Sequence, residues 1–190
     1  MQWNLLWTGR EYYSLENCLV NHSEKGALIT STIVGYYNNT IYKVDYLIET
    51  NRNWETIRFE IESRHNNQLQ SIKYEGDGKG NWRNEQGPAD QFTGCIDVDI
   101  PLTPFTNTLP INRLGLARNE QRAIRVLYVD LLEGQLRPAQ QQYTRLGDTA
   151  WHYENVPNDF EATIEVDEWG FVIDYPSLFV RTASLETHYR

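Results

Sequence analysis

Hydrophobic and polar residues alternate with a period of two along most of the chain, which predicts β-strands throughout. The clearest strand covers 54–62, where Ile57, Phe59 and Ile61 are predicted to face inward between polar neighbours. The best helical candidate, 119–132, also alternates as a strand. Because no helical period persists beyond about two turns, we predict an all-β protein of about a dozen strands of the usual length.

The strands fall into two groups with a similar order of features. Each group contains several strands, then an Asp-x-x-Gly turn, then a strand that carries aromatic residues. This short internal echo predicts one domain over 1–190, built of two related β halves (about 1–93 and 115–190) that the segment 94–114 joins. Common hairpin turns can produce the same repeated order by chance.

Composition narrows the choice of partners. The formal net charge is -9, from 26 acidic and 17 basic residues, and nucleic acids or anionic membranes need clustered Lys and Arg. We therefore expect neither as a partner. The six Trp and twelve Tyr combine apolar area with a polar tip, which suits a sheet that faces water or a ligand. Cys18 and Cys95 are too few for a disulfide framework, so we expect two buried thiols.

The chain shows no feature of export or membrane insertion. Its first residues, MQWNLLWTGREYY, lack the basic start and apolar core of a signal peptide. No apolar run approaches the roughly 18–20 residues that a membrane span needs. We expect a cytoplasmic protein without a transmembrane segment.

The segment 94–114, GCIDVDIPLTPFTNTLPINRL, holds the most unusual chemistry. Strand periodicity places Asp97 and Asp99 side by side on one face. Three interpretations remain open: a cation held by both carboxylates and the Asn107 amide, an acid or base whose pKa the neighbouring carboxylate raises, or a pair that orders the following loop while Arg113 balances its charge.

Three prolines stiffen the same segment and keep its backbone extended. Thr106, Asn107 and Thr108 then offer two hydroxyls and an amide, the groups that hydrogen-bond sugar hydroxyls. Asn and Thr also cap turns through their own backbone, so a structural role is equally compatible with this pattern. We expect Phe105 and Leu109 to fill the core.

Known catalytic and metal motifs give no support to an enzyme. The four histidines have no histidine partner two or four residues away, so a zinc site has no local support. Serine-hydrolase elbows, phosphate-binding loops and dinucleotide fingerprints are absent from the sequence. We expect no metal, no cofactor and no catalytic residue.

The segment 94–114 resembles the signature of a bacterial family of glycolipid-binding proteins. Weaker motifs extend the resemblance over nearly the whole chain, namely W-T-G-x-E from Trp7, G-x-G-x-W from Gly78, Q-x-Y-T from Gln141 and D-x-x-G-x-V-x-D-Y-P from Asp167. The resemblance implies two related, curled antiparallel sheets that form a partly open, barrel-like body with an internal cavity. The absence of an export signal departs from the pattern of envelope lipid carriers.

We therefore expect a non-catalytic protein that binds an amphipathic small molecule, such as a glycolipid, in a β-walled cavity. The alternatives are a hydrolase that uses the carboxylate pair and a structural β module that dimerises through its edge strands. The residues expected to bind the ligand are Asp97, Asp99, Thr106, Asn107, Arg113, Glu11, Trp82 and Tyr143.

Overall fold

A single curled sheet of fifteen strands makes up most of the computed structural model, which describes residues 1–187. The first arm contains β1 (Gln2–Gly9), β2 (Ser14–Ser23), β3 (Gly26–Tyr37), β4 (Thr40–Thr50), β5 (Thr56–His65), β6 (Gln68–Gly76), β7 (Trp82–Asn84) and β8 (Gly87–Pro88). The second arm contains β9 (Asp97–Asp99), β10 (Gln121–Asp130), β11 (Gln135–Arg145), β12 (Ala150–Val156), β13 (Glu161–Val166), β14 (Val172–Tyr175) and β15 (Phe179–Thr187). Between the arms lie the 3-10 turn η1 (Asp90–Phe92) and the helix α1 (Phe105–Leu114).

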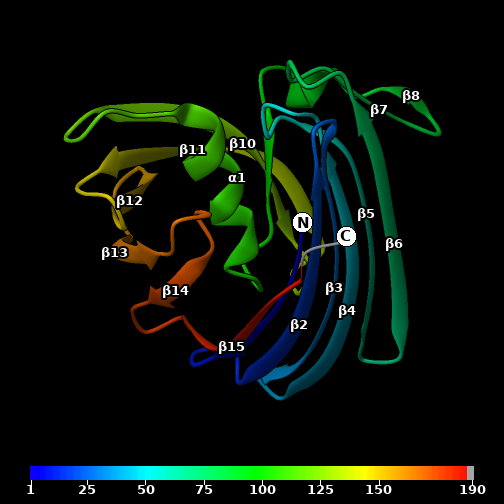
Figure 1. Ribbon diagram of the computed structural model, residues 1–190. Coiled ribbons are helices and arrows are strands. Elements are labelled where there is room, and N and C mark those ends of the chain that lie inside the picture. The colour runs from blue at the N-terminus through cyan, green and yellow to red at the C-terminus, as the bar shows by residue number, and fades with distance from the viewer. Residues whose placement is uncertain (188–190) are drawn as a thin grey trace.

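The strand order is β8-β7-β6-β5-β4-β3-β2-β1-β15-β14-β13-β12-β11-β10-β9, and the sheet does not close. Neighbouring strands are antiparallel except β9 and β10, which run parallel. The pairing of β1 with β15 joins the two arms, which curl around α1 (Figure 1). The all-β, curled and open fold is thus confirmed. The relatedness of the two halves stays a prediction.

The inner faces of the arms carry the core, as the alternation predicts. In β1, Trp3, Leu5 and Trp7 are buried. In β5, the inward positions of Phe59 and Ile61 are confirmed. The prediction for Ile57 was wrong: it is the extra residue of a bulge, since Thr56 pairs with Thr50 while Arg58 pairs with Glu49. An extra residue reverses the direction of the side chain relative to the strand that follows.

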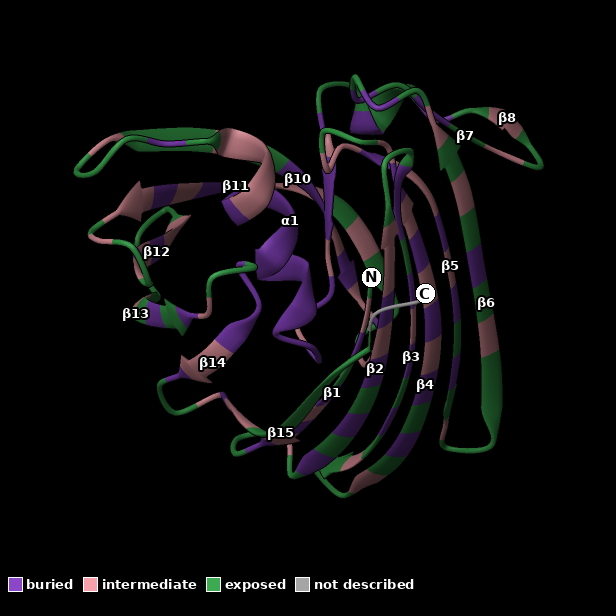
Figure 2. Cartoon of the chain, in the orientation of Figure 1, coloured by how far each residue is buried: buried purple, intermediate pink, exposed green. Residues whose placement is uncertain are grey.

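The helix α1 contradicts the expectation that the prolines keep this segment extended, because Pro110 lies inside the helix. Its sequence is poor in helix formers and includes Pro110, so its pattern does not indicate a helix. All residues from Phe105 to Ile111 are buried (Figure 2), and the left-handed backbone of Gly115, at φ 56°, ends the helix. Burial between the two arms stabilises a helix that this sequence alone does not favour.

The described residues contain no helix with the length and apolar character needed to cross a membrane.

Candidate ligand-binding site

The segment 94–114 runs along the concave side of the sheet, where β9 lies parallel to β10 and α1 follows. Asp97 and Asp99 of β9 both bond groups on α1, which agrees with the prediction that they share one face. Val98 and Ile100 belong to the hydrophobic core on the other side. The short strand therefore separates a polar layer from the core of the first arm.

Asp97 forms a buried ion pair with Arg113. The guanidinium donates from Nε to Oδ1 at 3.0 Å and from Nη2 to Oδ2 at 2.6 Å, and only 1% of the Asp97 side chain and 14% of the Arg113 side chain are exposed. Burial raises the pKa of Asp97, and the Arg113 bonds oppose that shift. Since both carboxylate oxygens are engaged, this pair fastens the end of α1 to β9.

Asp99 accepts hydrogen bonds from two side chains that belong to different elements. Thr106 Oγ1 of α1 donates at 3.1 Å and Gln141 Nε2 of β11 donates at 2.6 Å. Burial raises the pKa of Asp99, and the negative charge of Asp97 adds to the shift. The contacts of the two aspartates match the third interpretation of the sequence, in which the pair orders the following segment.

Asn107 lies one residue further along the helix and accepts a hydrogen bond from the hydroxyl of Tyr143 at 2.9 Å. Tyr143 is buried behind it, and burial raises the pKa of its hydroxyl, which is therefore the donor. Asn107 is 8% exposed and lines a cavity. Tyr143 thus positions the amide of Asn107 at the cavity wall.

A cavity of about 340 Å³ opens between α1, the segment that precedes it, β10 to β12 and β14. The turns that follow β1, β12 and β14 complete its lining. Its polar lining consists of Glu11, Asp99, Thr103, Asn107, Arg137, Gln140, Gln141, Asn155 and Asp159. Its aromatic lining consists of Tyr12, Tyr128, Tyr153, Phe160, Tyr175 and Phe179. This volume lies within the range of small-molecule sites, about 300–1,000 Å³, near its lower end.

The electrostatics of the cavity favour uncharged ligands. Three carboxyl groups, of Glu11, Asp99 and Asp159, face one guanidinium, of Arg137. That guanidinium lies 4.5 Å above the ring centre of Tyr128, a favourable cation–π geometry. Burial raises the pKa of Tyr128 to about 12, so its hydroxyl is protonated at neutral pH. The cavity therefore presents acceptors and neutral hydroxyls rather than an anion-binding surface.

Glu16 is a buried acid next to this site that the sequence analysis did not select. Its Oε1 accepts from Tyr46 and Ser31 at 2.7 Å and from Thr103 at 2.9 Å, while Oε2 has no partner among the described residues. Burial raises its pKa to about 7. The sequence contains one signal for a buried acid at this position. By alternation, Glu16 shares a face of β2 with Ser14 and Cys18, which are both buried.

The expected ligand-binding residues do not all reach the cavity. Glu11, Asp99 and Asn107 line it. Their supporting partners, Thr106 and Tyr143, lie behind the wall, as does the Asp97–Arg113 pair. Trp82 lies apart from this cluster. It packs on Phe59 in the first arm and donates from Nε1 to the Cys95 carbonyl at 2.6 Å.

The chain is similar to known proteins in family and in fold. A family model described as "Putative glycolipid-binding" matches residues 4–181. The crystal structure of a DUF1089 family protein from Pseudomonas aeruginosa is 33% identical, covers 87% of this chain and 91% of its own chain, and superposes with a TM-score of 0.78. No curated protein matches the chain. Since the family model covers most of the sequence, the chain belongs to this family.

Proposed function

We propose that the protein binds the glycosyl head group of an amphipathic lipid in the 340 Å³ cavity. The observation that carries this proposal is the combination of polar groups and aromatic rings in the lining of one cavity. Carboxylate, amide and hydroxyl groups can bond sugar hydroxyls, which both donate and accept. The aromatic rings offer flat apolar surfaces to the C–H face of a sugar ring.

The lining and the size of the cavity indicate which part of the ligand lies inside it and which part lies outside. Thr103, Asn107 and Gln141 are the buried polar residues of the lining. Val156 and Phe160 are 46% and 37% exposed, and Glu11, Arg137 and Asp159 are exposed as well. The buried polar groups suit a polar head group, and Val156 and Phe160 offer apolar surface to the start of an acyl chain. Because the volume is small, the cavity takes the head group and the acyl chains extend past the rim.

The charges favour a glycolipid over an anionic phospholipid. Placing a phosphate near Glu11, Asp99 and Asp159 opposes like charges, which costs binding free energy. We expect the protein to bind a monoglycosyl diacylglycerol at least about tenfold more tightly than a phosphatidylglycerol with the same acyl chains. Isothermal titration calorimetry with short-chain lipids measures this ratio, and equal affinities contradict the proposed head-group site.

Filling the cavity should remove binding without unfolding the protein. Ala139 lines the cavity on β11, so Ala139→Trp places an indole inside it, and we expect the affinity for the glycosyl lipid to fall at least about 100-fold. The matched control is Ala183→Trp, at an exposed position on β15 outside the cavity lining. Unchanged binding by a folded Ala139→Trp protein would place the ligand elsewhere.

The alternative of a hydrolase that uses both Asp97 and Asp99 receives less support from the geometry. Both oxygens of Asp97 are bonded to Arg113, so Asp99 alone of the pair borders the cavity. Incubation with the glycosyl lipid followed by mass analysis separates the two functions. Recovery of intact lipid supports binding, and release of free sugar that Asp99→Asn abolishes supports hydrolysis.

A further inference from the structure

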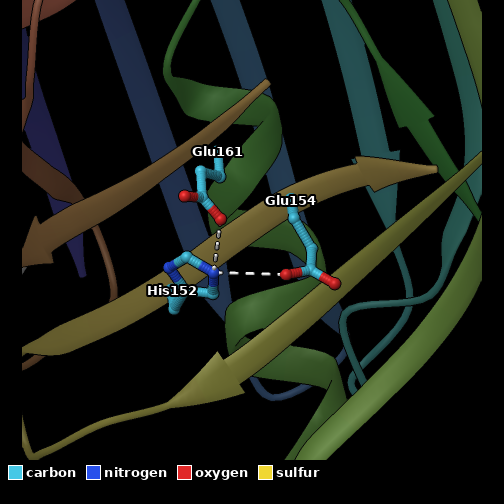
Figure 3. A group of neighbouring side chains, drawn as sticks. All are labelled: His152, Glu154 and Glu161. Carbon is cyan, nitrogen blue, oxygen red and sulfur yellow. Dashed lines mark hydrogen bonds and ion pairs between the residues drawn. The ribbon is translucent and has the colours of Figure 1, made fainter. Parts of the chain in front are cut away.

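Three metal-ligating side chains meet on the outer face of the second arm, away from the cavity. His152 and Glu154 are two residues apart on β12 and therefore share a face. Glu161 of β13 lies directly opposite Glu154 in the antiparallel register. Figure 3 shows the imidazole of His152 between the two carboxylates.

The separations of the three ligand atoms suit a metal ion. Nε2 of His152 is 3.2 Å from Oε2 of Glu154 and 3.6 Å from Oε2 of Glu161, and all three ligand atoms lie within 4.8 Å of one another. In tetrahedral zinc sites with bonds of about 2.0–2.2 Å, neighbouring ligand atoms are about 3.3–3.6 Å apart. The imidazole and each carboxylate therefore already have the spacing of ligands around one ion.

The electrostatics of the strand pair point to a cation independently of that spacing. Like charges at directly opposed positions of antiparallel strands destabilise the sheet, and Glu154 and Glu161 are such a pair. A neutral imidazole can donate one hydrogen bond from Nε2 and so can satisfy one of the two carboxylates. A divalent cation between the three groups attracts both carboxylates at once.

A neighbouring strand holds one ligand in place. Gln142 of β11 donates from Nε2 to Oε1 of Glu154 at 2.7 Å, which leaves Oε2 directed at His152. Outer hydrogen bonds of this kind orient metal ligands in zinc proteins and commonly change metal affinity by 10–100-fold.

We propose that His152, Glu154 and Glu161 form a zinc site, with the fourth position open to water or to a carboxylate of another molecule. A site with three protein ligands and an open position is the arrangement of zinc centres that bind a further ligand. The spacing of histidines in the sequence does not indicate this site, because one imidazole combines here with two carboxylates and one of these comes from the next strand. The site is independent of the proposed glycolipid function.

Titration of zinc chloride into EDTA-treated protein, followed by calorimetry, tests the proposal. We expect one zinc ion per chain, and at least a 100-fold loss of affinity in His152→Ala. The conservative variant Glu161→Gln, at a side chain that is 60% exposed, should lose at least tenfold. Glu165→Gln, an exposed carboxylate two positions beyond Thr163 on the same face of β13, is the matched control and should keep the wild-type affinity.

A second measurement guards against variants that fail to fold. Cobalt(II) bound to the wild-type protein should give the visible absorption of a tetrahedral complex, and zinc should displace it. Absence of one-to-one binding, or wild-type affinity in folded His152→Ala and Glu161→Gln proteins, overturns the proposal and assigns the three groups to a surface ion pair.

Discussion

Asp97→Ala is expected to lower the free energy of unfolding by about 3–5 kcal/mol, the range for removal of one partner from a buried ion pair. The reason is that Arg113, 14% exposed and bonded to Asp97 through two nitrogens, is left buried and without its counter-charge. Urea unfolding followed by tryptophan fluorescence measures the change.

Two variants separate charge burial from general sensitivity to mutation. Asp45→Ala removes an exposed partner of Lys43 and should cost no more than about 1 kcal/mol. Replacing Asp97 by Leu and Arg113 by Met together removes both charges and should recover most of the stability that Asp97→Ala loses. A loss in Asp97→Ala as small as that in Asp45→Ala would contradict a fastening role for the pair.

Glu16→Gln is expected to stabilise the protein relative to the wild type, and this effect should grow as the pH rises. Burial raises the pKa of Glu16 from 4.5 to about 7 in the folded protein, so the folded state holds this proton over a range where the unfolded state releases it. Stability of the wild type therefore falls as pH rises above about 4.5, and the loss is complete above about pH 7. A shift of this size corresponds to about 3 kcal/mol.

The expected result is a difference in the free energy of unfolding between variant and wild type that grows with pH. Relative to the wild type, Glu16→Gln should gain about 3 kcal/mol between pH 4 and pH 8, because glutamine carries no proton to lose. Glu24→Gln changes an exposed glutamate in the turn after β2 and should show no such growth. A Glu16→Gln difference in the free energy of unfolding that stays constant across this range would mean that the pKa of Glu16 is the same in the folded and unfolded protein.

Glu16 and Asp97 each support a different residue of the cavity lining. Thr103 donates to Glu16 and also lines the cavity, whereas Asp97 anchors the helix that carries Asn107 to the cavity wall. Measurement of glycosyl-lipid affinity in the same variants therefore reports how far the support of α1 and the acid beneath Thr103 affect the site.

Local sequence pattern determined the strands and the family signature. Period-two alternation predicts an inward face for Phe59 and Ile61 because successive side chains of a strand point to opposite sides. The same rule placed Asp97 and Asp99 on one face, where the structure confirms them. These features depend on neighbours within a few residues, so one sequence contains the information for them.

Contacts between distant segments were decided by the tertiary structure alone. The helix α1 forms because both arms bury it, although its residues have low helical propensity. The bonds of Asp99 to Gln141 and of Glu16 to Thr103 cross 42 and 87 residues of chain. The Glu154–Glu161 pair depends on the register of β12 and β13. Alternation fixes which face a side chain occupies, but the curl and register of the sheet decide which residue it meets there.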